Sequence, residues 1–284
     1  MPPTPQRRWY QFSLKTMLIV MTFLCLGPGS YVAFEQRKAS KEKAAVQAVE
    51  KLGGTVEYDQ TVRSRSALMR AILGDDTFGN AHSLDLSNRS GVADEDLVHL
   101  KMFPRLANLC LDKTQVSDAG LVHLEGLTEL KLLRLGSTPI TSDGLAHLQP
   151  LQELRALDLR RTDVTDTGLS YLAGLKNLQI LQLNATRVSD FGLVHLAGLA
   201  NLEVLVLNGT IVKDAGFVHL VNLKNLEQLL LDDTQVTDDA LIQIQQLPKL
   251  KGLQLMRTKV TDDSVRNLQT ARPDLRITLR TNYP

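Results

Sequence analysis

One repeating pattern runs along most of this chain and restricts the fold it can adopt. A threonine returns every 24 residues, and each is followed by an aspartate and then by two apolar residues, usually leucines. The threonines are Thr114, Thr138, Thr162, Thr186, Thr210, Thr234 and Thr258. A period of this size is typical of a solenoid, in which each unit packs only on its neighbours. The pattern therefore predicts a stack of coils, with the threonine hydroxyls bonded to turn backbone.

Each repeat divides into a strand half and a helix half. The strand half carries a pair of leucines separated by one residue, which predicts parallel strands with one face buried. Nine such strand cores lie at 84–86, 109–111, 133–135, 157–159, 181–183, 205–207, 229–231, 253–255 and 277–279. The first interval is 25 residues and the others are 24, with the extra residue placed in 88–91.

The helix half begins with a hydroxyl residue followed by aspartate. A hydroxyl accepts from the free amides at a helix start, and a carboxylate suits the positive helix end. Leucines three residues apart, such as Leu193 and Leu196, supply the inward face. The expected caps are Ser117, Thr165, Ser189, Thr237 and Thr261. The expected left-handed helix ends are Gly126, Gly174, Gly198 and Asn222.

These motifs resemble the leucine-rich repeat family. The stretch 162–169, Thr-Asp-Val-Thr-Asp-Thr-Gly-Leu, is similar to the cysteine-containing subtype with threonine in place of cysteine. The resemblance covers 82–284 and implies an α/β solenoid, a curved right-handed coil with a parallel β-sheet on its concave face and short helices on its convex face. It also implies that the sheet binds protein partners. The segments 12–18 and 51–58 resemble the front end of membrane-attached bacterial repeat proteins.

An apolar segment near the N-terminus predicts one membrane-spanning helix. Arg7, Arg8 and Lys15 precede an uncharged run over residues 16–34. At about 1.5 Å per residue this run reaches roughly 28 Å, close to a hydrocarbon core of about 30 Å. A cleaved signal sequence, with secretion of the repeats, is the alternative. If the segment at 16–34 stays in place, its resemblance to a signal sequence favours a single-pass topology with the repeats on the extracytoplasmic side.

Between this segment and the repeats, a cap is expected. The chain should form a helix up to Gly53, a short strand at 55–58 and a second helix at 66–73. The apolar stripe of the first helix is Ala45, Val46, Ala48, Val49 and Leu52. A cap is needed because a bare solenoid end exposes core leucines and a strand edge. The predicted organisation is a basic tail at 1–15, an anchor or signal at 16–34, a cap at 35–81 and repeats at 82–284.

Composition argues against several functional classes. The 32 basic and 31 acidic residues give a formal charge of +1, which provides no field for holding nucleic acid. The two cysteines, Cys25 and Cys110, cannot build a disulfide framework or a cysteine metal site. No catalytic triad, phosphate-binding loop or dinucleotide fingerprint stands apart from the repeat. We therefore expect no enzyme activity and no cofactor.

Two polar columns could suggest metal sites, but the repeat explains both. Neighbouring imidazoles on adjacent coils could share a metal, although each histidine simply precedes the last leucine of its helix. The histidines are His99, His123, His147, His195 and His219. The aspartates could suggest calcium, although helix starts account for them. They are Asp94, Asp118, Asp166, Asp190, Asp214, Asp238 and Asp262.

The variable strand positions mark a candidate binding surface. Side chains alternate between the two faces of a strand, so the residues beside the buried leucines point outward. They form an apolar band with polar residues around it, which is typical of interaction sites. A competing interpretation is that β-branched residues simply suit a sheet. The candidate partner-binding residues are Leu132, Arg134, Ala156, Asp158, Ile180, Gln182, Val204, Val206 and Leu230.

Taken this far, the sequence predicts a non-catalytic scaffold, tethered through 16–34, that binds a protein or envelope component on its concave sheet. One alternative is a passive envelope protein that self-associates through its C-terminal edge, where no helix follows 277–279. That edge allows a homo-oligomer. A third alternative is an enzyme or metal-binding protein whose site is hidden within the repeats.

Overall fold

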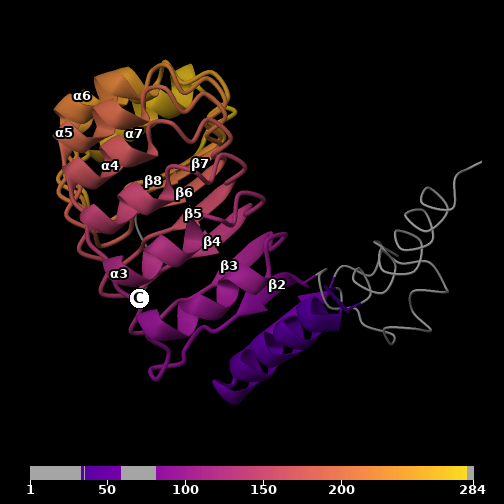
Figure 1. Cartoon of the computed structure of the whole chain (residues 1–284). Coiled ribbons are helices and arrows are strands. Elements are labelled where there is room, and N and C mark those ends of the chain that lie inside the picture. The colour runs from indigo at the N-terminus through magenta and orange to yellow at the C-terminus, as the bar shows by residue number, and fades with distance from the viewer. Residues whose placement is uncertain (1–32, 35, 59–80, 280–284) are drawn as a thin grey trace, which may run out of the picture.

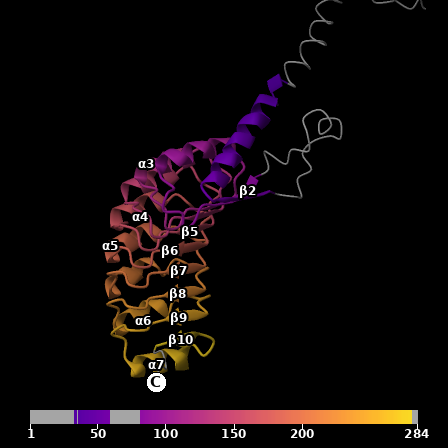
Figure 2. The same cartoon turned by 90° about the horizontal axis from the view of Figure 1, so that it is seen from below.

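The computed structural model describes residues 33, 34, 36–58 and 81–279, and these form a curved stack of coils (Figure 1). Ten strands of the described residues make one sheet in chain order. β1 (Thr55–Tyr58) pairs antiparallel with β2 (Ala81–Asp85), and each later strand runs parallel to the one before. Figure 2 shows the strands on the inner side of the curve and the helices on the outer side. The predicted solenoid with a parallel sheet is confirmed.

The strands follow one another in a constant register. Leu109 pairs with Leu133, a shift of 24, whereas Leu84 pairs with Leu109, a shift of 25. The later strands are β3 (Asn108–Cys110), β4 (Leu132–Arg134), β5 (Ala156–Asp158), β6 (Ile180–Gln182), β7 (Val204–Val206), β8 (Gln228–Leu230), β9 (Gly252–Gln254) and β10 (Arg276–Thr278). Within the described residues the nine parallel strands are therefore confirmed. From β3 onward each begins one residue before the predicted leucine pair.

Short helices alternate with the strands on the outer side. Five are α-helices: α3 (Asp118–Leu121), α4 (Asp166–Leu172), α5 (Asp190–Leu193), α6 (Asp238–Ile244) and α7 (Asp262–Ala271). The others are 3-10 helices: η1 (Asp94–Met102), η2 (Val122–Leu124), η3 (Asp143–Leu148), η4 (Val194–Leu196) and η5 (Asp214–His219). The predicted inward face is confirmed, because leucines such as Leu193 and Leu196 are fully buried.

The threonine column forms the expected hydroxyl ladder. In each coil the threonine Oγ1 donates to the carbonyl of the leucine three residues earlier, at 2.5–2.8 Å. Six of these side chains are buried, and only Thr258 near the C-terminal end is partly open. A buried hydroxyl is tolerated only when it is bonded, so this bond explains why threonine recurs.

The aspartates at the helix starts join one coil to the next. Asp166 accepts from the amide of Ser189 at 2.7 Å and from its hydroxyl at 2.6 Å. Asp94, Asp118, Asp214 and Asp238 make the same two bonds to the following coil. These carboxylates therefore bond across coils in addition to lying at the positive ends of their own helices.

One predicted cap differs because its neighbour differs. In the coil before Thr165, Ser142 takes the position of the aspartate and accepts from the Thr165 amide at 3.0 Å. The Thr165 hydroxyl lies 2.8 Å from that of Ser142 and does not cap its own helix, so this cap was wrongly predicted. The caps at Ser117, Ser189, Thr237 and Thr261 are confirmed.

Left-handed residues follow the strands rather than the helices. The four predicted helix ends do not have a positive φ, and this prediction was wrong. The helices instead end in right-handed conformations, for example at Glu125 and Ala173, so they need no left-handed residue. The turn after each strand does need one, with φ between 52° and 67°. These residues are Asn88, Lys113, Ser137, Arg161, Ala185, Gly209, Asp233 and Arg257.

A helix over residues 36–51 covers the first coil. Ala45, Val46 and Val49 are buried and join the core beside Leu84 and Leu86. In Figure 1 this helix is drawn in indigo next to β2. Gly53 ends it with φ +79°, and β1 then extends the sheet. The expected helix and strand are both present, whereas the second expected helix at 66–73 lies outside the described residues.

The structure describes only the end of the predicted anchor. Of residues 16–34, the structure describes 33 and 34, which are helical, and the rest lie outside the described residues. Among the helices that are described, none has both the length and the apolar character needed to cross a membrane.

Candidate functional site

Two columns of side chains run across the inner face of the sheet. In the first column, the register of β4 to β7 places four apolar residues opposite one another: Leu132, Ala156, Ile180 and Val204. The second column is polar in β4 to β6 and apolar in β7 and β8: Arg134, Asp158, Gln182, Val206 and Leu230. The structure thus places all nine predicted residues in two adjacent columns.

This band of nine residues is half-buried rather than open. Seven of the nine are partly accessible, while Asp158 and Val206 are each only 6% exposed. The cause is spacing: parallel strands lie about 4.8 Å apart, and on the inner side of a curve their side chains crowd together. The band is therefore a tightly packed surface with one apolar and one mixed column, and not the exposed patch that strand alternation alone predicts.

A network of four charged residues occupies one end of this band. Arg134 Nε lies 2.7 Å from the Asp112 carboxylate, and Arg160 Nε lies 3.2 Å from that of Asp158. Arg160 also reaches to 3.8 Å from Asp112. Burial raises the pKa of Asp158, while the Arg160 amide and guanidinium oppose that shift. Because buried carboxylates need partners, both arginines are committed to balancing them.

A polar hollow of about 480 Å³ lies beside the band, at the turns that follow the strands. It is lined by Asp112, Lys113, Gly136, Ser137, Arg160, Arg161, Asn184, Ala185, Asn208, Gly209 and Asp233. Asn208 Oδ1 accepts from the Asp232 amide of the next coil at 2.9 Å, whereas the buried Oδ1 of Asn184 has no hydrogen-bond partner among the described residues. The hollow therefore suits groups that form hydrogen bonds.

Comparison with known proteins agrees with this geometry. No protein-family model matches the sequence, and no curated protein matches it. Internalin C2 from Listeria monocytogenes is 29% identical with a TM-score of 0.59, over 72% of this chain and 82% of that chain. A second internalin from the same bacterium is 22% identical with a TM-score of 0.56, over 73% of this chain and 63% of that chain, and shows the fold alone. The chain has the fold of leucine-rich repeat proteins.

The outer side of the coils carries apolar residues that the sequence pattern did not bring out. The most exposed are Phe191, 83% accessible, and Ile242, 62% accessible. Val122, Val194 and Val218 share the repeat position of Ile242. The sequence could have indicated these valines and Ile242, because each directly precedes a member of the histidine column or its continuation at Gln243.

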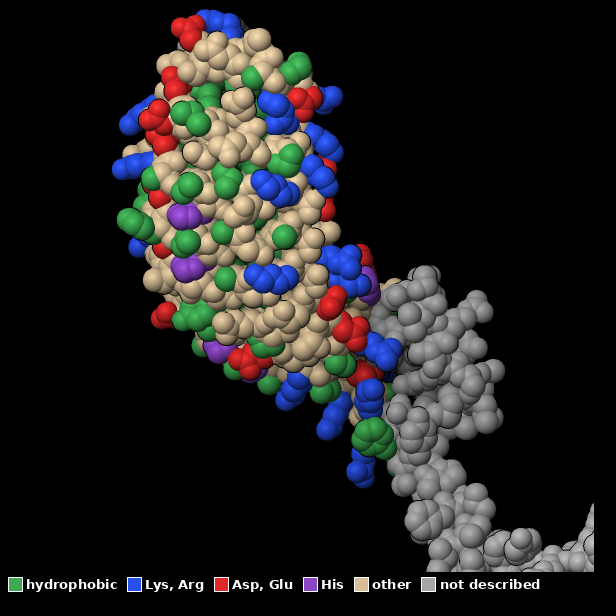
Figure 3. All heavy atoms as spheres, turned by 90° about the horizontal axis from the view of Figure 1, so that it is seen from above, with side chains coloured by type: hydrophobic (Ala, Val, Ile, Leu, Met, Phe, Trp, Pro, Cys, Tyr) green, Lys and Arg blue, Asp and Glu red, His purple; other side chains and the backbone are tan. Residues whose placement is uncertain are grey.

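The histidine column lies on the helix side of the repeats. Figure 3 shows histidine side chains (purple) following one another along the stack, with basic and acidic side chains interspersed around them. His147 Nδ1 lies 2.6 Å from Glu125 Oε1 of the preceding coil. Across the described part of the chain, no group of three or more histidine, cysteine or acidic residues could hold a metal.

Cys110 is a free, half-buried thiol whose pKa is raised mainly by burial.

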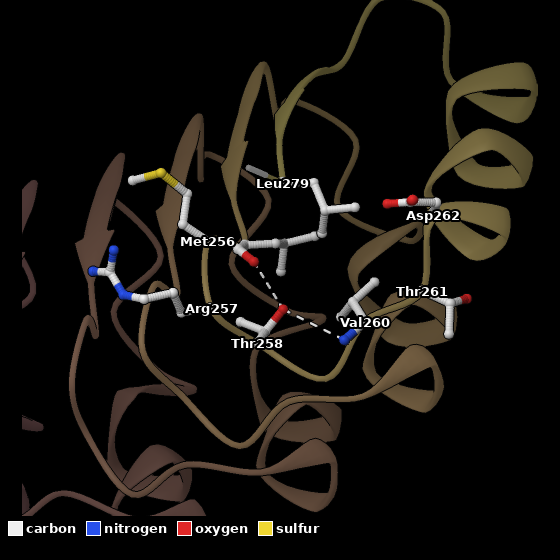
Figure 4. A pocket seen from close by; sticks show the side chains of 8 residues that line it. Met256, Arg257, Thr258, Val260, Thr261, Asp262 and Leu279 are labelled. Carbon is white, nitrogen blue, oxygen red and sulfur yellow. Dashed lines mark hydrogen bonds between the residues drawn. The ribbon is translucent and has the colours of Figure 1, made fainter. Parts of the chain in front are cut away.

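At the C-terminal end, the last coils enclose a second hollow of about 550 Å³ (Figure 4). Its walls include Leu279, Val260 and Thr258, and the Thr258 hydroxyl donates to the Leu255 carbonyl at 2.8 Å. Residues 280–284 lie outside the described residues. The expected C-terminal contact between copies therefore stays a prediction.

Proposed function

We propose that this repeat protein binds a protein partner on the inner face of its sheet. The observation that supports this most is the unbroken apolar column across β4 to β7, set among polar neighbours. Burying apolar surface favours association, and the net gain is what remains after the entropy lost on binding. Side chains already packed by their neighbours lose little further entropy on binding. The half-buried band can therefore form a contact at a small entropic cost.

The polar residues of the band would give the contact its selectivity. Gln182 and Arg134 are half-buried beside the apolar column, and Asp158 lies between them in the register. A partner that leaves such groups unpaired loses affinity, whereas one that bonds to them is favoured. Val206 and Leu230 extend the apolar area toward the C-terminal coils.

We further propose that the protein is a non-catalytic scaffold tethered to the membrane, with its repeats on the extracytoplasmic side. The uncharged run at 16–34 and the basic residues before it support the tether. Secretion after cleavage is the alternative. Cell fractionation together with N-terminal sequencing of the mature chain separates the two, because cleavage would place a new N-terminus after this run.

The binding proposal is tested with the paired substitution Ile180→Asp and Val204→Asp in the full-length chain. Two carboxylates in the apolar column should abolish capture of a partner in a proximity-labelling experiment, because each would have to be desolvated on binding. The matched control is Val194→Asp with Val218→Asp, which places the same charges on exposed apolar residues of the outer side. This control should leave capture unchanged.

The opposite pattern, with capture lost only in the outer-side pair, would move the partner to the helix side and refute the proposal. Capture unchanged in both pairs, with oligomers that dissociate on changing Arg276 at the C-terminal edge, would favour a self-associating scaffold. Turnover of a small-molecule substrate by the purified full-length chain would favour a hidden enzyme site.

A further inference from the structure

The sign of the charged residues on the inner face changes along the stack. The coil at 179–185 carries none. The coils before it, around β3 to β5, carry six basic residues and two acidic ones: Lys113, Lys131, Arg134, Arg155, Arg160 and Arg161 with Asp112 and Asp158. The two coils after it carry only acidic residues: Glu203, Glu227, Asp232 and Asp233. The net charge of +1 therefore hides two regions of opposite sign.

The acidic region is largely neutralised within the protein. Lys251 Nζ lies 2.7 Å from Glu227, and Arg257 forms an ion pair with Asp233. Asp232 is buried and accepts from the amide of Met256 at 2.7 Å. Glu203 is exposed and accepts only from Gln179 Nε2 at 3.4 Å, so one carboxylate is left on this half of the inner face for a partner to meet.

The basic region is not neutralised. Arg134 and Arg160 balance the two buried aspartates. The remaining four side chains are exposed, and among residues 33, 34, 36–58 and 81–279 none of them has an ion pair or side-chain hydrogen bond. These four unpaired cations are Lys113, Lys131, Arg155 and Arg161.

The unpaired cations stand on both sides of the apolar column. Lys131 and Arg155 lie where strands begin, on consecutive coils, with the Arg155 amide bonded to the Lys131 carbonyl at 2.8 Å. Lys113 and Arg161 lie in the turns after the strands, where both line the polar hollow. Leu132, with Ala156 beside it, is therefore bordered by positive charge on two sides.

We infer that the partner segment is acidic as well as apolar, with carboxylate side chains flanking the apolar residues that sit over β4 and β5. This inference rests on the proposed function and narrows it. Exposed cations act over about 10 Å at ordinary salt, so they select a complementary surface at close range. A basic segment over β4 and β5 would instead meet four like charges, because Asp112 and Asp158 are already paired with arginines there.

A direct test uses two fluorescein-labelled ten-residue peptides, one alternating Glu with Val and one alternating Lys with Val. Fluorescence anisotropy with the full-length protein should show binding of the Glu–Val peptide, weakening as salt rises. The paired reversal Lys131→Glu with Arg155→Glu should weaken it by about tenfold or more, because each site turns from attraction to repulsion. The matched control, Lys213→Glu with Lys259→Glu, makes the same charge change outside the inner face and should have little effect.

A second variant separates lost binding from lost folding. Arg161 has φ +54°, a conformation that glycine adopts without strain. Arg161→Gly should therefore keep the fold while removing one of the four cations, and should weaken the Glu–Val peptide by a smaller factor than the double reversal.

Three results would overturn the inference: the Lys–Val peptide binds as well as the Glu–Val peptide, neither binds, or the control reversal weakens binding as much as the inner-face reversal. The proposed function fails separately. If a bound peptide of either charge is unaffected by Ile180→Asp with Val204→Asp, the inner face is not the contact. If the Lys–Val peptide binds and is lost in that variant, the binding face stands and only its charge preference is wrong.

Discussion

At the scale of single residues, one hydroxyl per coil resolves a conflict between burial and backbone polarity. The turn after each strand leaves a leucine carbonyl inside the stack, and the threonine three residues later supplies a donor for it. A carbonyl left unbonded in the core costs about 1–3 kcal/mol. The threonine column is therefore a structural requirement of the repeat, and its regularity carries no information about a ligand.

Removing one of these hydroxyls should weaken the fold by a known mechanism. Thr162 is 5% exposed and donates to Leu159 at 2.6 Å, so Thr162→Val keeps the shape and removes the donor. We expect the free energy of unfolding in urea to fall by about 1–2 kcal/mol. Thr128→Val, at an exposed threonine, is the control and should change little. Equal stability of the two variants would show that the hydroxyl ladder contributes nothing.

At the scale of secondary-structure elements, the links between neighbouring helices matter more than the helices themselves. Several helices are only one turn long and could not persist in isolation. The carboxylate at the start of one helix holds the amide and hydroxyl at the start of the next, so each helix is positioned by its predecessor. Between Asp166 and Ser189 the link consists of two hydrogen bonds to a carboxylate. Between Ser142 and Thr165 the acceptor is an uncharged hydroxyl, so the link is weaker.

Cutting one such link should therefore cost more than removing an ordinary surface charge. Asp166→Ala removes two bonds to Ser189, and bonds to a charged group are worth about 1.5–3 kcal/mol each. We expect chemical denaturation to show a loss of about 2 kcal/mol or more. Asp143→Ala is the control, because Asp143 is exposed and lies one residue outside the ladder. A similar loss in both variants would indicate a general charge effect rather than a link between coils.

The same element scale separates what sequence could predict from what it could not. Leucine spacing predicts which residues face the core, so the strands, the inward helix face and the members of the candidate site follow from it. The half-burial of Ile180 and its neighbours could not be predicted, since it depends on how closely curvature brings adjacent coils together. The pairing of Glu227 with Lys251 could have been predicted, because the two residues are 24 apart and the register places them on adjacent coils.

At the scale of the whole molecule, stability passes from coil to coil. Each unit contacts its neighbours, so an interior coil is supported from two sides and a terminal coil from one. The helix over 36–51 supplies the missing support at the N-terminal end, where Val49 packs into the same core as Leu84. Repeat spacing made the stack predictable. The position of the cap at the first coil was also predictable, because a bare solenoid end needs a cover, whereas the set of core residues that Val49 joins was not.

Destabilising the cap should therefore loosen the array from its N-terminal end rather than unfold it uniformly. Val49 is buried, and Val49→Asp places an unpaired charge against the first coil, at a cost of about 3 kcal/mol. Hydrogen exchange should then accelerate at the amides of β2 and η1, while β8 and β9 keep their protection, because local opening spreads only through neighbouring contacts. Ala44→Asp adds the same charge to an exposed position of the same helix and should leave both regions protected. Equal acceleration at β2 and β9 would mean that the stack opens as one cooperative unit, and that the cap stabilises the partner-binding coils as strongly as it does the first.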